Sequence, residues 1–257
     1  MSDKPSRHAV PYIRQTAKLR ALHFTADEMQ SCMLIREPDT LQLEYTRTMM
    51  GFLYFQHRPG HIGMVGLGGG SLAKFCHRHL PQSRITVIEN NPHVIALREQ
   101  FLVPPDDDRL AVHHGDGADF VHTAPACFDA LLLDAYDPTG VPARLKSQAF
   151  FDACRAALTP QGTLVANLNV DDISAPLMLA RLRQSFDDVL VTLEDAHHGN
   201  RIVFAGPALR TRRSGAIRRP AGLSREAWAQ LVIVFARVQS AVTQWRTTSA
   251  LADRAQD

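Results

Sequence analysis

The segment His61–Ser71, HIGMVGLGGGS, is the clearest indication of the fold, because it combines a short apolar strand, a glycine-rich turn and the start of a helix. Glycine lets the backbone turn tightly and approach a ligand, and the N–H groups of the first helical turn face that ligand. Glycine-rich strand-to-helix turns also occur for packing reasons, so the motif needs support from its context. With that support, Gly66, Gly68 and Gly70 are candidate ligand contacts.

The sequence around this turn alternates short apolar runs with helical patterns, which is typical of a parallel sheet covered by helices. The expected parallel strands are His61–Leu67, Arg84–Glu89, Leu110–His113, Asp129–Leu133 and Thr163–Asn167. A short connection joins two further strands, Val189–Leu193 and Arg201–Ala205, which must therefore pair antiparallel at the sheet edge. The sequence thus predicts an α/β, Rossmann-like domain with seven strands over residues 51–206.

Two further segments flank this domain. In residues 1–50, Ser31–Arg36 and Leu41–Tyr45 enclose the turn-forming residues 37–40 and predict a small β-hairpin. Residues 207–257 contain a basic linker and then an amphipathic helix, whose apolar residues recur at steps of three and four: Trp228, Leu231, Phe235, Val238, Val242 and Trp245. This stripe packs either on the same chain or in a homodimer, and the sequence leaves both open. Ser224 is the expected N-cap of this helix.

Four successive strands end on residues suited to a nucleoside. Glu89 ends the second strand, 23 residues beyond Gly66, and Asp116 and Asp134 follow the next two. The carboxyl ends of parallel strands line one crevice, where a carboxylate in the position of Glu89 accepts hydrogen bonds from ribose. We expect Asp116 to accept a hydrogen bond from the adenine amino group. Because the loop departs from the dinucleotide spacing GxGxxG, the pattern favours an adenosyl sulfonium compound such as S-adenosylmethionine.

Residues Gln30 to Leu168 resemble the spermidine/spermine synthase family of polyamine aminopropyltransferases. The best match is DAYDPTGVPARLKSQAFFDACRAALTPQGTLVANL, Asp134–Leu168, which contains an Asp-x-x-Asp-Pro-x-Gly segment followed by a Phe-Phe helix and a Leu-x-Pro-x-Gly turn. The resemblance implies transfer of an aminopropyl group from decarboxylated S-adenosylmethionine to a putrescine-type amine, with release of methylthioadenosine. It also implies contacts to the methylthioadenosine part from four residues: Gln30, Glu89, Asp116 and Gly117.

The same resemblance makes Asp134 the catalytic acid/base residue and assigns Tyr136 and Asp137 to the amine substrate. The chemistry agrees, because an alkyl amine with a pKa of about 10.4 is almost fully protonated at neutral pH and cannot attack. A nearby carboxylate can attract the cation, orient it and take its proton. Asp137 also precedes Pro138 and fits a turn, so a purely structural role stays open for it.

Several positions depart from the family pattern. Gly69 stands where the family has an aspartate that contacts the aminopropyl amine of the donor, and Val141 stands where proline is usual. The segment Thr46–Met49 aligns with the family's Tyr-His-Glu-Met. Within that segment Arg47 would repel a diamine unless it points away. Two alternatives therefore stay open: a methyltransferase that uses intact S-adenosylmethionine, and a catalytically silent nucleoside-binding module.

The overall composition excludes several other classes of protein. The 257 residues are 45% hydrophobic and hold 28 Lys+Arg against 26 Asp+Glu, as expected of a folded chain. The apolar runs are shorter than the roughly 18 residues of a membrane helix, and four scattered cysteines without a CxxC pair predict a cytoplasmic protein. The histidines show no zinc-ligand spacing, so no metal is expected. The basic linker lacks interleaved aromatic residues and does not favour nucleic-acid binding.

Overall fold

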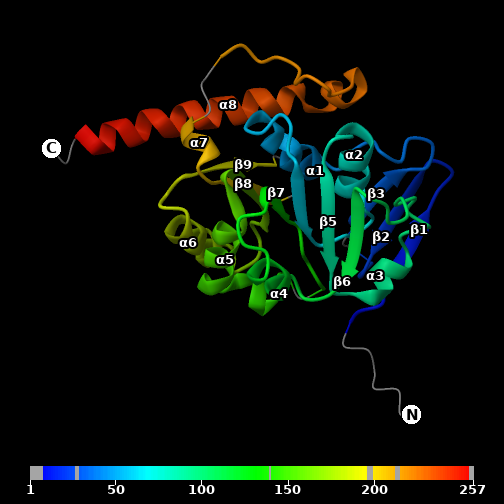
Figure 1. Cartoon of the computed structure of the whole chain (residues 1–257). Helices are drawn as coiled ribbons and strands as arrows, with labels where there is room; N and C mark the ends of the chain where they lie inside the picture. Colours follow the sequence, from blue (N-terminus) through cyan, green and yellow to red (C-terminus); the bar gives the residue numbers. More distant parts are fainter. Residues whose placement is uncertain (1–7, 27–28, 139, 196–198, 212–214, 255–257) are drawn as a thin grey trace.

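The computed structural model describes residues 8–26, 29–138, 140–195, 199–211 and 215–254. Its centre is a seven-stranded sheet in the order β6-β5-β4-β7-β8-β10-β9, covered by helices on both faces (Figure 1). The strands are β4 (His61–Val65), β5 (Arg84–Glu89), β6 (Leu110–His114), β7 (Phe128–Leu133), β8 (Leu158–Asn169), β9 (Leu190–Glu194) and β10 (Asn200–Ala205). Neighbours among β4 to β8 pair in parallel, whereas β10 pairs antiparallel with β8 and β9. The predicted fold class is confirmed.

The sheet divides its apolar side chains between two clusters, one on each face. In β7, Ala130 and Leu132 belong to one cluster, and Leu131 and Leu133 belong to the other. Successive side chains of a strand point to opposite faces, so a strand covered on both sides is apolar at every position. The helices between the strands are α2 (Ser71–His79), α3 (Pro92–Ala96), α4 (Gly117–His122), α5 (Gln148–Ala157) and α6 (Ala175–Ser185). Of these, α2 and α3 pack on the first cluster, and α4, α5 and α6 pack on the second.

The N-terminal β-structure differs from the expected hairpin. It is a three-stranded antiparallel sheet of β1 (Tyr12–Gln15), β2 (Leu19–His23) and β3 (Met29–Leu34), in that order. The expected first strand, Ser31–Arg36, overlaps β3, but its partner is β2 and not Leu41–Tyr45. The hairpin prediction is wrong because the turn at residues 37–40 does not bring its two flanks together as strands, and β3 pairs instead with β2, which precedes it in the chain.

The segment that was expected to form the second strand of the hairpin leads into a helix. The turn itself forms, with the Thr40 N–H donating to the Glu37 carbonyl at 3.1 Å. The next N–H, that of Leu41, donates to the Gln230 side chain at 2.9 Å and pairs with no strand. Helix α1 (Glu44–Met49) follows, and the 3₁₀ helix η1 (Met50–Tyr54) continues it to the large sheet.

The C-terminal helix α8 (Arg225–Arg254) lies along one face of the molecule (Figure 1). Ser224 is its N-cap as expected, because the Ser224 hydroxyl accepts a hydrogen bond from the Ala227 N–H at 3.1 Å. The apolar stripe of α8 packs on η1, β9 and α1 of the same chain. The stripe therefore gives no support to a homodimer, which stays a prediction. A short helix α7 (Ala208–Thr211) precedes α8.

One apolar cluster joins residues from all three segments of the predicted domain division, 1–50, 51–206 and 207–257. The boundaries of that division stay a prediction. Among the described residues, no helix combines the length and the apolar character that crossing a membrane requires.

Candidate functional site

A cavity of about 340 Å³ opens at the carboxyl ends of β4, β5 and β7, and residues of β2, β3 and α1 complete its wall. This is the edge of an open parallel sheet at which ligands bind. Eight of the ten predicted site residues line the cavity: Gln30, Gly66, Gly68, Glu89, Gly117, Asp134, Tyr136 and Asp137. Gly70 and Asp116 are not among its lining residues. The assigned roles of all ten residues stay predictions.

The glycine loop after β4 passes so close to the loop after β7 that it has no room for a side chain. Gly66 has a φ of +100°, and a Cβ there would lie 2.1 Å from the carbonyl oxygen of Asp134. Gly70 has a φ of +68° and is the N-cap residue of α2, where a Cβ would lie 2.3 Å from the Val103 side chain. Gly66 therefore shapes the cavity floor, whereas Gly70 permits the start of the helix.

Glu89 is buried, and backbone donors fix both of its carboxylate oxygens. Its Oε2 accepts a hydrogen bond from the Leu67 N–H, and its Oε1 accepts one from the Asn91 N–H, each at 2.8 Å. The carboxylate thereby links the end of β5 to the glycine loop. It remains at the cavity wall, where a free lone pair on either oxygen can accept from a sugar hydroxyl.

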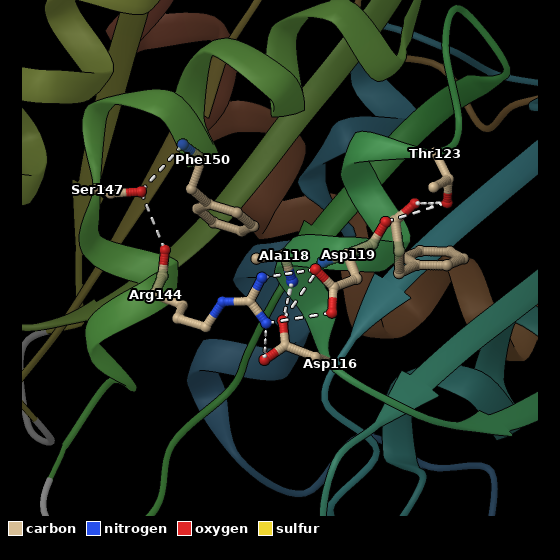
Figure 2. Close-up of polar contacts among 8 residues, drawn as sticks. Asp116, Ala118, Asp119, Thr123, Arg144, Ser147 and Phe150 are labelled. Carbon is tan, nitrogen blue, oxygen red and sulfur yellow. Dashed lines mark hydrogen bonds and ion pairs between the residues drawn. The ribbon is translucent and has the colours of Figure 1, made fainter.

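Asp116 has its carboxylate engaged within the protein (Figure 2). Its Oδ1 caps α4 by accepting from the Ala118 and Asp119 N–H groups at 2.7 Å and 3.3 Å. Its Oδ2 lies 2.8 Å from Arg144 Nη1. The neighbouring Gly117 lines the cavity. A direct bond from Asp116 to adenine stays a prediction, and the structure shows a helix cap with an ion pair.

Asp134 follows β7 and lies partly buried at the cavity wall. Asn167 Nδ2 in β8 donates to its Oδ1 at 3.0 Å, and the Tyr45 hydroxyl is a second donor. Burial raises the pKa of Asp134 above its ordinary value, and the hydrogen bonds from Asn167 and Tyr45 oppose this rise. A carboxylate with a raised pKa binds a proton more strongly, which suits a group that accepts one from a substrate.

Tyr45 is a cavity residue that the sequence comparison missed. The sequence signal for it is the family's Tyr-His-Glu-Met segment, whose tyrosine aligns with Thr46, one residue after Tyr45. Burial, together with the charge of Asp134, raises the pKa of Tyr45 well above its ordinary value, so the hydroxyl stays neutral and donates. The guanidinium of Arg47 binds the carbonyls of Leu41 and Gln42, at 2.6 Å and 3.1 Å, and does not line the cavity.

The two predicted amine contacts sit on a well-anchored segment. The Tyr136 hydroxyl donates to the Asn167 carbonyl at 2.9 Å and accepts from the Asn169 N–H at 2.7 Å. Asp137 and Gly140 exchange two backbone hydrogen bonds of 3.0 Å each, so Asp137 does form a turn. Because Asp137 also lines the cavity, the turn role and the amine role are compatible.

The charge at the cavity wall is negative. Within the described part of the chain, its lining includes Glu89, Asp134 and Asp137 and neither lysine nor arginine. Such a wall attracts a cationic ligand and disfavours an anionic one. No group of three or more His, Cys, Asp or Glu residues that could hold a metal ion is found among the described residues.

Comparison with known proteins places the chain in a family. Residues 42–185 match the model of the spermine/spermidine synthase domain. The chain is 35% identical to a polyamine aminopropyltransferase of Chromobacterium violaceum over 205 residues, which are 79% of this chain and 78% of the relative.

Two solved structures share the fold. A probable spermidine synthase from Corynebacterium glutamicum has a TM-score of 0.67 and 21% identity, covering 86% of this chain and 81% of that one. Human methyltransferase-like protein 13 in complex with SAH has a TM-score of 0.59 and 25% identity, and the match covers 77% of this chain and 93% of that one. The family match and the bacterial relative together show that the chain is a transferase that belongs to the spermine/spermidine synthase family.

Proposed function

We propose that the protein transfers an aminopropyl group from decarboxylated S-adenosylmethionine to a putrescine-type amine and releases methylthioadenosine. The observation that carries this proposal is Asp134, a carboxylate of raised pKa at the wall of a cavity whose described lining residues include further carboxylates and neither lysine nor arginine. The named activity of the bacterial relative supports the same reaction. Both proposed substrates are cations, so both suit this wall.

The glycine loop, Glu89 and Gly117 are proposed to hold the adenosyl part of the donor. Gly66 and Gly68 let the backbone approach the nucleoside, and Glu89 accepts hydrogen bonds from ribose. The SAH in the human structure is an adenosyl thioether of the same kind.

The proposed reaction at Asp134 is a single displacement. Asp134 takes a proton from the substrate ammonium group, and the freed nitrogen lone pair attacks the CH₂ group next to the sulfonium. The new N–C bond forms as the C–S bond breaks, and its electron pair neutralises the sulfur, so the leaving group needs no acid. Holding amine and donor in line supplies much of the acceleration, and we propose that Tyr136 and Asp137 hold the amine.

A specific feature keeps methyl transfer from intact S-adenosylmethionine as a second candidate. A Cβ at Gly69 would lie 2.9 Å from side-chain atoms of both Ser31 and Phe101, and the Gly69 N–H donates to Ser31 Oγ at 2.9 Å. Ser31 and Phe101 therefore occupy the space that the family's loop aspartate would need. This chain has no aspartate at position 69 to select the decarboxylated donor.

Calorimetry with the two donors separates these candidates. We expect decarboxylated S-adenosylmethionine to bind at least about tenfold more tightly than the intact form, because the acidic wall repels the extra carboxylate by about 1.4 kcal/mol or more. Glu89→Gln should weaken both donors, since ribose is common to them. Tighter binding of the intact form would contradict the proposed donor.

The pH dependence of the reaction should report the Asp134 environment. A general base works only when deprotonated, so kcat/KM should fall as the pH drops through the raised pKa of Asp134. In Asn167→Ala the Asp134 carboxylate loses a hydrogen-bond donor that stabilises its charged form, so its pKa rises further. The fall of kcat/KM at low pH should then occur about one pH unit higher than in the wild type. Asn169→Ala is the matched control, because the Asn169 side chain accepts from the Asp171 N–H and does not donate to Asp134. If kcat/KM of Asn167→Ala fell at the same pH as that of the wild type, Asp134 would not be the general base.

A further inference from the structure

Arg144 binds two carboxylates at the start of α4 (Figure 2) and does not itself line the cavity. It belongs to the 3₁₀ helix η2 (Ala143–Lys146), which follows the Asp134–Asp137 segment. Its Nη1 lies 2.8 Å from Asp116 Oδ2, and its Nη2 lies 2.5 Å from Asp119 Oδ1. Nη1 also donates to Asp119 Oδ2 at 3.2 Å, so the guanidinium binds Asp119 through both carboxylate oxygens. One side chain thus holds two carboxylates of the first turn of α4.

The residues next to these ion pairs form the cavity wall. Gly117 lies between the two carboxylates in the α4 turn, and Pro142 and Leu145 flank Arg144 in the chain; all three line the cavity. The wall on one side therefore belongs to α4, the wall on the other belongs to the η2 segment, and Arg144 connects them. The backbone at Gly117 packs closely on β4, because a Cβ there would lie 2.4 Å from the Val65 side chain.

We propose that Arg144 is a positioning residue that fastens the η2 segment to the first turn of α4 and thereby sets the affinity for the adenosyl part of the donor. This inference rests on the proposed function only in taking an adenosyl compound as the ligand. A wall that is held in place before binding needs no ordering when the nucleoside enters, and this lowers the cost of binding. The pairing with Arg144 also holds the pKa of Asp119 below its ordinary value, so the clamp is charged at neutral pH.

The expected size of the effect follows from exposure. The Arg144 side chain is 57% exposed, so each ion pair is worth little and salt screens it. A bidentate contact shared with a second carboxylate is stronger than an isolated surface pair. We expect Arg144→Gln to weaken the binding of methylthioadenosine by about fivefold at low salt. The difference from the wild type should shrink at high salt.

The test is calorimetric titration of the full chain with methylthioadenosine at low and high salt, combined with steady-state KM values. Arg144→Gln and Asp119→Asn should both raise the dissociation constant and the donor KM, and both should leave the amine KM within twofold. Arg144→Lys should recover part of the affinity. Arg183→Gln is the control, because Arg183 forms a similarly exposed pair with Asp188, at 3.1 Å and with 52% exposure, and does not line the cavity.

The outcomes separate this inference from the proposed function. If Arg144→Gln binds methylthioadenosine within twofold of the wild type at low salt, Arg144 does not position the wall. If the wild type binds neither methylthioadenosine nor S-adenosylhomocysteine, the adenosyl ligand itself is wrong and both proposals fall. Should Arg144→Gln fold poorly, Asp119→Asn gives the same test with the guanidinium still present. An unchanged affinity in that variant would equally overturn the proposal.

Discussion

Asp134→Asn should reduce kcat for aminopropyl transfer by about 10²- to 10⁴-fold, the range that a positioned general base supplies. Asparagine has the same shape and can still accept from Asn167, but it cannot take a proton from the amine. The donor dissociation constant should change little, because the adenosyl contacts lie on the glycine loop, Glu89 and Gly117. Single-turnover measurement of methylthioadenosine release at saturating amine checks the expectation.

A control variant shows whether the loss at Asp134 is specific. Asp171→Asn removes one negative charge from an exposed residue that does not line the cavity, so it should retain nearly all activity. Turnover in Asp134→Asn within about threefold of the wild type would show that another group accepts the proton. The half-buried Tyr45 would then be the next residue to test, because its hydroxyl adjoins the same carboxylate.

Gly66→Ala should destabilise the protein by about 3 kcal/mol or more and abolish donor binding. The new Cβ would meet the Asp134 carbonyl oxygen at 2.1 Å, and the φ of +100° is strained for any residue with a side chain. Backbone strain of this kind costs about 1–3 kcal/mol, and forcing an atom into filled space adds about as much. Because the loop can relieve the clash only by moving away from Asp134, the cavity floor moves too. Urea unfolding and donor calorimetry measure the two effects.

The matched control for Gly66 is Gly215→Ala. A Cβ at Gly215 would meet nothing within 4 Å, so stability should stay within about 0.5 kcal/mol of the wild type or rise slightly. If Gly66→Ala unfolded at the same urea concentration as the wild type, the close approach between the β4 and β7 loops would be disproved.

The parts of the fold that follow from local pattern were predictable. Strand β7 reads as a continuous apolar run because both of its faces are covered, and that feature is visible without any structure. The partner of β3 was not predictable in the same way, since the residues of β1 and β2 show little alternation and their pairing depends on long-range contacts. The path after Thr40 likewise depends on Gln230, which lies 189 residues beyond Leu41 in the chain.

In the candidate site, too, the features that follow from local pattern were predictable and those that depend on long-range contacts were not. Glu89 and Asp134 could be predicted to line one crevice because each stands at the carboxyl end of a strand of the same parallel sheet, β5 and β7, on either side of β4. Asn167 and Tyr45 reach Asp134 from β8 and α1, and only the folded chain shows that they are hydrogen-bond donors to this carboxylate. The ion pair of Asp116 with Arg144 was also hidden, because a carboxylate at a strand end gives no sign that a cation 28 residues later neutralises it.

The most direct test of the proposed reaction is mass spectrometry of the products formed from decarboxylated S-adenosylmethionine and putrescine. The account predicts equal amounts of methylthioadenosine and a mono-aminopropylated amine, with both products formed about 10²- to 10⁴-fold more slowly by Asp134→Asn. A methylated product from intact S-adenosylmethionine, or no product from a panel of diamines with either donor, would contradict it.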